Sequence, residues 1–402
     1  MTVIEYGEIR KILDSRGRES VEVDIYTTNG FGRAAAPSGA STGRYEVVAY
    51  PGNSVDRGIE AFEEYIMPQI LGYDALYQRD IDKLLHEIDG TDNFSRIGGN
   101  VAVATSMAVA KAAADSLGLP LYRYLGGVFS PSMPYPLGNV LGGGKHSIGG
   151  TDIQEYLVMA KAKKFRDCAI INAKVHRRVG EVLREKLPGV AIGRGDEGAW
   201  NAPLPDLEAL DLVISCAREV EEEYGVKIDL GLDVAASHLW RNGKYYYRDR
   251  VLTRDEQIEF IAEIVEHYNL RVVEDPLHED DFEGFARLTD IVGKDTLIVG
   301  DDLYVTQSDR IERGTEMGAG NAVLIKPNQV GTLTDTFSAI KKAKKHGFNI
   351  IVSHRSGETC DSTIAHIAVA AGAYAIKTGA ISGERVAKLN EIMRIEDLEE
   401  AW

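Results

Sequence analysis

Charged side chains recur where short, β-branched runs of the sequence end. Three of these ends carry the carboxylates Asp233, Glu274 and Asp301. No cysteine or cluster of histidines accompanies them, so they form an all-oxygen set of the kind that binds a hard cation such as Mg²⁺. Held together without a cation, three carboxylates would repel one another. The residue types therefore predict a magnesium site, provided that the three ends meet in space.

Two lysines, Lys326 and Lys377, end later runs of the same kind. A lysine held near a divalent cation and a second lysine loses proton affinity, which makes a neutral amine available as a base. Removing a proton beside a carboxylate leaves a dianionic enediolate, which forms only where its charge is neutralised. The set indicates reaction at a carbon next to a carboxylate. The alternatives are an ion pair of Lys326 with Asp301 or Glu274, and a purely structural Lys377.

The elements that must position these residues follow a repeating pattern. Six β-branched runs each end in charged residues and are followed by helical stretches, and the fifth ends in His354 and Arg355. One acid after a strand is usually a helix cap, but six repeats make that reading improbable for the set. Repeated βα units imply a parallel sheet. With further strand candidates around 154–158 and 190–192, we expect a closed, TIM-like βα barrel whose active site lies at the carboxyl ends of its strands.

The N-terminal part has a different rhythm. Residues 3–36 contain apolar runs joined by a hairpin signal at Thr28-Asn29-Gly30, and residues 55–126 change to a helical period. The Ala-rich segment 98–117 predicts a buried helix. We therefore expect an α+β domain over residues 1–128 and the barrel over residues 134–402, separated by a Gly/Pro-rich run at 126–144.

Composition excludes several classes of function. The 402 residues carry a formal charge of −17, so general binding to nucleic acid or anionic membranes is not expected, and an anionic substrate needs a local cationic site. The longest chargeless run, 124–144, contains three prolines and predicts no membrane span. Three scattered cysteines and a charged N-terminus without an apolar signal segment predict a reduced, cytoplasmic protein.

Eight segments of the chain resemble the signature motifs of the enolase family, 2-phospho-D-glycerate hydrolyases, and run in the family's order. They are PSGASTG (37–43), GDEG (195–198), LDVAAS (232–237), EDP (274–276), GDDL (300–303), KPNQVGT (326–332), SHRSGET (353–359) and IKTGA (376–380). KPNQVGT and GDEGAW look archaeal. The resemblance implies the enolase-superfamily fold and reversible, Mg²⁺-dependent dehydration of 2-phospho-D-glycerate to phosphoenolpyruvate in glycolysis and gluconeogenesis. It also implies a homodimer or homo-octamer.

The resemblance further implies roles for individual residues. Asp233, Glu274 and Asp301 would hold one Mg²⁺, and Ser41 a second that binds with the substrate. Lys326 would take the C2 proton, and Glu197, supported by Glu155, would protonate the departing C3 hydroxyl. The remaining residues expected to contact the small phosphorylated carboxylate, or to act as the family's loop histidine, are Gln154, His354, Arg355, Ser356, Lys377 and His146. Arg355 and Ser356 would hold the phosphate, and Lys377 the carboxylate.

Each role has an alternative in the residues themselves. Ser41 fits a turn, His146 an exposed loop, and Glu155 an indirect partner of the site. Glu197 fits a carboxylate that neutralises Arg194, and Arg355 fits an ion pair with Glu358 or Asp361. The chain departs from the family at Arg18-Glu19, in the loop 144–152, at Ala199 and at His238. The rival functions are an acid-sugar dehydratase of the same superfamily and a non-catalytic binding paralogue.

Overall fold

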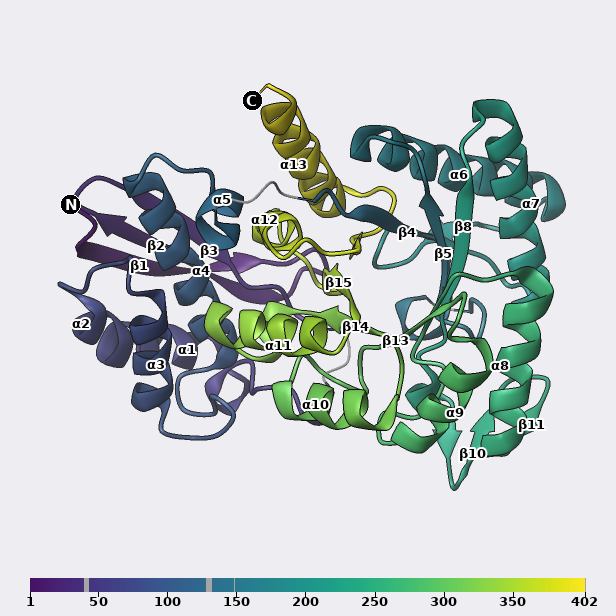
Figure 1. The fold of residues 1–402 in the computed structure, drawn as a ribbon, viewed down its shortest axis with the longest axis horizontal. Coiled ribbons are helices and arrows are strands. Elements are labelled where there is room, and N and C mark those ends of the chain that lie inside the picture. The colour runs from purple at the N-terminus through teal and green to yellow at the C-terminus, as the bar shows by residue number, and fades with distance from the viewer. Residues whose placement is uncertain (40–42, 128–131, 148, 402) are drawn as a thin grey trace.

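The computed structural model describes residues 1–39, 43–127, 132–147 and 149–401. In Figure 1 the N-terminal part, in purple and blue, lies beside the larger C-terminal part. The chain begins with an antiparallel sheet in the order β1-β2-β3. Its strands are β1 Ile4–Leu13, β2 Glu19–Thr27 and β3 Phe31–Ala35. The predicted hairpin between β2 and β3 is confirmed.

Helices follow this sheet, as the change of period predicts. Their bounds are α1 Val55–Ala61, a π-helical turn Phe62–Ile66, α2 Met67–Ile70, α3 Gln78–Asp89, α4 Gly99–Ser116 and α5 Leu121–Gly126. The predicted buried helix is α4, which packs on β2 and β3. A Cβ added to Gly32 of β3 would come within 2.0 Å of the Ala108 carbonyl oxygen. Small residues therefore let α4 lie directly on the sheet.

Among the described residues, eight strands of the C-terminal part close into a barrel in the order β4-β5-β8-β12-β13-β14-β15-β16, with β16 pairing back to β4. The strands are β4 Tyr135–Gly142, β5 Glu155–Ala160, β8 Ile228–Asp233, β12 Val272–Glu274, β13 Leu297–Gly300, β14 Ala322–Ile325, β15 Asn349–Ser353 and β16 Ala375–Lys377. The helices around them are α6 Phe165–Lys186, α7 Asp206–Tyr224, α8 Arg254–Tyr268, α9 Phe282–Val292, α10 Ser308–Met317, α11 Leu333–Lys345, α12 Thr363–Ala370 and α13 Gly383–Glu400. The predicted barrel class is confirmed.

Of the two further strand candidates, the one around 154–158 is confirmed as β5, and the one around 190–192 is wrong. Residues 190–192 form no strand, and Val190 is 43% exposed, so this segment has no buried face for a barrel wall. The missing strand is β4, which lies in the run 126–144 that was expected to be a linker. Its Gly138 faces Ala380 and Asn172 so closely that a Cβ would lie 3.2 Å from the Ala380 methyl. Glycine here reflects tight packing and not a turn.

The six repeating βα units form the parallel sheet that the sequence predicts, and the antiparallel exception in the barrel is β5. β5 runs antiparallel to both of its neighbours, β4 and β8. Among the described residues between β4 and β5, no helix crosses the barrel, and a direct connection between neighbouring strands makes them antiparallel. The remaining barrel pairs are parallel.

One short hairpin extends the barrel, and a small three-stranded sheet is separate from it. β6 Gly193–Arg194 and β7 Trp200–Asn201 flank the GDEG segment, and β7 pairs with β4. β9 Trp240–Arg241, β10 Lys244–Tyr246 and β11 Val251–Leu252 form a separate small sheet. Asn242 and Gly243 form the turn between β9 and β10, with positive φ at both residues.

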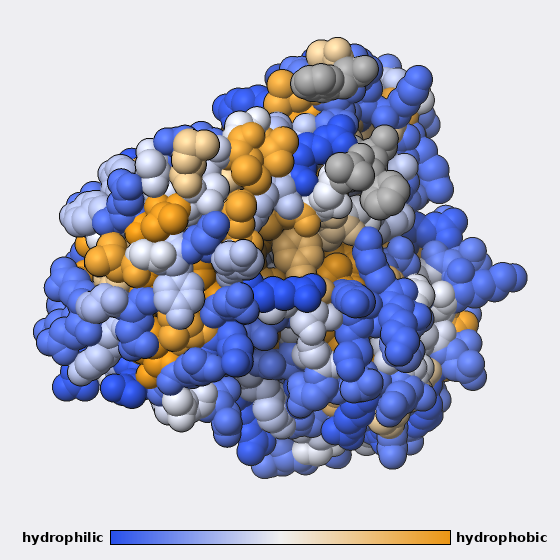
Figure 2. Space-filling view, turned by 60° about the vertical axis from the view of Figure 1, so that its left-hand side comes forward, coloured by the Kyte–Doolittle hydropathy of each residue, from blue (hydrophilic) through white to orange (hydrophobic). Residues whose placement is uncertain are grey.

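An apolar layer fills the inside of the barrel below the strand ends. Its members are Leu137, Leu157, Met159, Val272, Val299, Ala322, Leu324, Ile351 and Ala375. Figure 2 shows that hydrophilic side chains cover much of the face in view, with hydrophobic groups in separate patches. Within the described residues, no helix is long and apolar enough to cross a membrane.

Candidate active site

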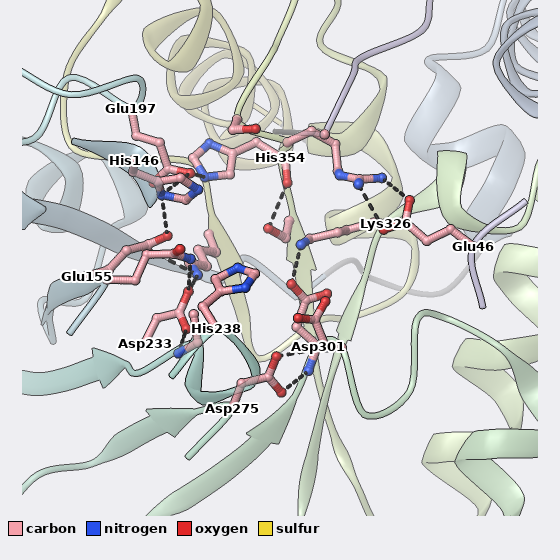
Figure 3. Close-up of a pocket in the computed structure, with 18 residues that line it drawn as sticks. Glu46, His146, Glu155, Glu197, Asp233, His238, Asp275, Asp301, Lys326 and His354 are labelled. Carbon is pink, nitrogen blue, oxygen red and sulfur yellow. Dashed lines mark hydrogen bonds and ion pairs between the residues drawn. The ribbon is translucent and has the colours of Figure 1, made fainter. Parts of the chain in front are cut away.

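A polar pocket lies at the carboxyl ends of the barrel strands (Figure 3). β8 and β16 end at Asp233 and Lys377, and Asp301, Lys326 and His354 directly follow β13, β14 and β15. The pocket brings together most of the predicted site residues, namely His146, Gln154, Glu155, Glu197, Asp233, Asp301, Lys326, His354, Arg355, Ser356 and Lys377. Glu274, at the end of β12, is buried and contacts Lys377. Ser41 lies outside the described residues.

Lys377 is the centre of a buried ionic cluster. Its Nζ lies 3.1 Å from Asp233 Oδ2, 2.7 Å from Glu274 Oε2 and 3.1 Å from Glu155 Oε2. Burial alone would lower the pKa of Lys377, but Asp233, Glu155 and Glu274 raise it well above its ordinary value. Where no cation binds these carboxylates, Lys377 is held in its charged form by its three acidic neighbours.

Lys326 forms the ion pair with Asp301 that the sequence analysis gave as an alternative. Burial opposes the charge on Lys326, yet Asp301 raises the pKa of the amine above its ordinary value. The same contact holds the pKa of Asp301 low, although burial acts in the opposite direction. When Asp301 binds another partner, it no longer stabilises the protonated amine of Lys326, and the pKa of that amine falls.

The pocket contains more carboxylate side chains than cationic side chains to neutralise them. Burial and the neighbouring Asp233 raise the pKa of Glu274 well above its ordinary value. Burial and Asp301 raise the pKa of Asp302 to about 7. Single oxygens of Asp275, Asp301 and Asp302 lie within 4.8 Å of one another. This excess of buried oxygen ligands fits a divalent cation.

Asp275 and Asp302 are site residues that the sequence analysis missed. Asp275 directly follows the predicted ligand Glu274 in the motif EDP, and Asp302 directly follows Asp301 in GDDL. This adjacency in the sequence could have identified them as site residues. The two oxygens of Asp275 accept the backbone N–H groups of Asp301, at 2.9 Å, and of Asp302, at 2.8 Å. Asp275 therefore fixes the backbone that carries Asp301.

A second cluster of acids and histidines occupies the opposite side of the pocket, where Figure 3 shows Glu197, His146 and His354 together. His354 Nε2 lies 3.1 Å from Glu197 Oε1, and Asn139 donates to Glu197 Oε2 at 3.2 Å. His146 Nδ1 lies 3.4 Å from Glu155 Oε1 and 3.7 Å from Glu197 Oε1. This loop histidine is thus 12% exposed and not the exposed residue considered as an alternative.

The two carboxyls of this cluster differ in proton affinity. Burial, reinforced by Glu197, raises the pKa of Glu155. For Glu197 burial is outweighed by His354 and His146, which hold its pKa well below the ordinary value. Neighbouring carboxyls with diverging pKa values are typical of acid–base sites. Arg194 lies over the Trp200 ring, at 4.8 Å, so the alternative of an Arg194 partner for Glu197 is not what the structure shows.

Arg355 forms a third side of the pocket. Its Nη1 donates to Glu46 Oε2 at 2.9 Å and to Asn328 Oδ1 at 2.8 Å, and its Nη2 donates to Glu46 Oε1 at 3.0 Å. The side-chain ion pair is therefore with Glu46, and not with Glu358 or Asp361 as the sequence alternative had it. Asp361 pairs with Lys111 instead. Glu46 is 6% exposed and was missed because its partner lies 309 residues away.

Two further polar side chains line the pocket. Gln154 Nε2 donates to Asp233 Oδ2 at 3.3 Å. His238, which follows β8, has a pKa lowered to about 4 by burial and by the nearby Lys145. His238 is therefore a neutral side chain near neutral pH and adds no positive charge beside the carboxylates.

A barrel with carboxylates and lysines at its strand ends, beside an α+β domain, defines the class as an enolase-superfamily barrel protein. The family models described as "Enolase, N-terminal domain" and "Enolase, C-terminal TIM barrel domain" match residues 4–125 and 130–401. The chain belongs to the enolase family.

Archaeal relatives match nearly the whole chain. A protein named Enolase from Methanothermobacter thermautotrophicus is 52% identical over 402 residues, 98% of this chain and 97% of its own length. One from Natronomonas pharaonis is 53% identical, over 98% and 99% of the two chains. One from Picrophilus torridus is 49% identical, over 98% of each.

Proposed function

We propose that this pocket catalyses the reversible dehydration of 2-phospho-D-glycerate to phosphoenolpyruvate. The chain is accordingly a phosphopyruvate hydratase, a carbon–oxygen hydro-lyase. The observation that carries the proposal is the arrangement of three chemically distinct sides in one pocket. Lys326 and Asp301 lie across the pocket from Glu197 and His146, and Arg355 also lines the pocket.

The cationic residues bind the two ends of the substrate. Arg355 holds the phosphate with Ser356, because a guanidinium matches phosphate oxygens in a bidentate geometry. Lys377 pairs with the substrate carboxylate, and Gln154 and His354 complete the contacts. Arg355 and Ser356 favour a phosphorylated substrate over the unphosphorylated acids of sugar-acid dehydratases. The proposed acids and bases, Lys326, Glu197 and Glu155, are all present in the described part of the site, which argues against a non-catalytic paralogue.

Asp233, Glu274 and Asp301 would hold the first Mg²⁺, and Ser41 a second that binds with the substrate. When bound, the metal neutralises the negative charge that develops on the substrate carboxylate.

Two residues handle the protons. Lys326 takes the C2 proton once Asp301 no longer holds its amine protonated, and the electron pair of the C2–H bond becomes the C2=C3 bond. Glu197, supported by Glu155 and His146, passes a proton to the C3 hydroxyl, so that the C3–O bond breaks and water leaves; because the pKa of Glu197 is held low, that proton is supplied through Glu155, whose pKa burial raises. The reverse reaction uses the same groups in the opposite order.

The proposal extends to the setting of the reaction. Residues 1–128 form the capping domain and 134–402 the catalytic barrel. The protein acts in the cytoplasm, in glycolysis and gluconeogenesis, as a homodimer or homo-octamer.

The two proton-handling roles are separable by isotope exchange. Each variant is incubated with 2-phosphoglycerate and Mg²⁺ in deuterated water, and C2 exchange is followed by NMR alongside product absorbance. Lys326→Ala should lose both exchange and product formation by about 10²–10⁴-fold, the scale of a general base. Glu197→Gln should lose product formation but keep exchange. The opposite pattern reverses the two roles, and full turnover in both variants contradicts the proposed site.

A further inference from the structure

Arg385, near the start of α13, is a buried cation that the proposed reaction does not use. Its side chain is 0% exposed, and a fully buried arginine is rare unless its donors are bound. It lies outside every role expected from the sequence. Its position therefore calls for a partner inside the molecule.

The guanidinium joins two loops of the site. Nη1 lies 3.0 Å from His354 Nδ1 and also donates to the Arg355 carbonyl. Nη2 donates to the Ser356 carbonyl at 2.8 Å and to the Asp196 carbonyl at 3.2 Å. Arg385 thus holds the segment that carries His354 and, through Asp196, the backbone directly before Glu197.

The contact with His354 determines where the imidazole carries its proton. A guanidinium is always protonated and only donates, so His354 Nδ1 must accept. In the neutral ring the proton then lies on Nε2, which faces Glu197 Oε1 at 3.1 Å. Burial lowers the pKa of His354 to about 3, so the ring is neutral near neutral pH. Arg385 therefore donates to His354 Nδ1, and the protonated Nε2 on the other side of the ring lies beside Glu197 Oε1.

We propose that Arg385 is a positioning residue for the acid step, which acts through His354 to hold Glu197 at the departing hydroxyl. This inference rests on the proposed function and deepens it. Loss of Arg385 frees the imidazole to rotate or to adopt the other tautomer, so that Nε2–H no longer lies beside Glu197 Oε1. Removal of the C2 proton by Lys326, on the opposite side of the pocket, does not depend on these contacts.

The test compares two rates in variants of α13. Arg385→Met is expected to lower phosphoenolpyruvate formation by about 10²-fold, the lower end for a misplaced acid, with less than about threefold loss of C2 exchange in deuterated water. Lys388→Met is the matched control, because Lys388 is another buried cation on α13 that contacts Thr359 and Glu358 and not His354. It should change both rates by the same factor. Equal losses of both rates in Arg385→Met overturn the proposal.

A second measurement does not depend on a folded variant. In the unaltered protein with ¹⁵N-labelled histidine, His354 should be the neutral Nε2–H tautomer. A proton on Nδ1, or an imidazolium at neutral pH, overturns the proposal. Failure of the proposed function can be told apart from failure of the role of Arg385. If the proposed function is wrong, Glu197→Gln will not lose turnover while keeping C2 exchange. If Glu197→Gln separates them and Arg385→Met does not, only the role of Arg385 is wrong.

Discussion

Arg355 is the residue whose geometry most directly concerns substrate choice. Its two terminal nitrogens already engage a carboxylate in a bidentate pair, which is the geometry that phosphate oxygens also match. Replacing Arg355 with Lys keeps one charge and loses this planar fork. We expect a higher KM for 2-phosphoglycerate, by about tenfold for a loss of 1.4 kcal/mol, with a smaller change in Mg²⁺ affinity. An unchanged KM would assign Arg355 to the ion pair alone.

The pair between Glu46 and Arg355 should also contribute to stability. Both side chains are buried, and removing one partner of a buried pair commonly costs about 3–5 kcal/mol. Glu46→Ala should therefore lower the thermal unfolding midpoint clearly. Glu87→Ala, which breaks an exposed pair with Lys83, is the control and should change stability by about 0.5 kcal/mol or less. Equal midpoints for the two variants would contradict this role of Glu46.

Site residues at strand ends can be predicted from the sequence, whereas site residues whose partners lie in distant elements cannot. Asp233, Glu274 and Lys326 are predictable because a barrel brings the carboxyl ends of its strands to one place. Glu46 and Arg385 come from the N-terminal part and from the last helix, so no local spacing marks them. Their partners are set by packing between elements, which one sequence does not reveal.

The packing of α3 against α11 links the N-terminal part to the barrel. His86 Nε2 of α3 lies 2.8 Å from Asp335 Oδ2 in the first turn of α11. The hydrogen bond to Asp335 raises the pKa of His86, although burial opposes it. Because the pKa of His86 is higher in the folded protein than in the unfolded chain, its pair with Asp335 stabilises the fold fully at pH values below the unfolded-state pKa. This stabilisation is lost as the pH rises through the folded-state pKa of His86.

This contact predicts a pH-dependent effect of mutation. His86→Gln should destabilise the protein at about pH 6, near and below the ordinary pKa of histidine, and much less at about pH 8. Thermal unfolding of both proteins at the two pH values measures the difference. A difference that grows with pH has the wrong sign and contradicts the ion pair.

The composition of β4 explains why the sequence does not reveal this barrel strand. The repeating units from β8 to β16 are β-branched and end in polar residues, so their period is visible. β4 contains Pro136, Gly138 and Gly142, residues that ordinarily interrupt strands. A strand forms here nevertheless, because its glycines pack closely against neighbouring elements. Tertiary packing overrides the local turn signal there.

At the scale of the molecule, the fold and the metal site are separate features. The barrel interior below the site is apolar, and the proposed ligands lie above it at strand ends. Removing divalent metal should leave the far-ultraviolet circular dichroism largely unchanged while activity is lost. Excess Mg²⁺ should restore activity to the chelated, dialysed protein. Loss of secondary structure on chelation would mean that the metal is part of the core.

The central claim is that this barrel dehydrates a phosphorylated hydroxy acid with the help of Mg²⁺, and one absorbance assay tests it. The purified protein is given 2-phosphoglycerate, or an unphosphorylated sugar acid, with Mg²⁺ or with chelator. We predict phosphoenolpyruvate formation from 2-phosphoglycerate with Mg²⁺, none after chelation, and no dehydration of the unphosphorylated acid. Full activity after chelation would contradict the metal-dependent mechanism, and a preference for the unphosphorylated acid would contradict the proposed substrate.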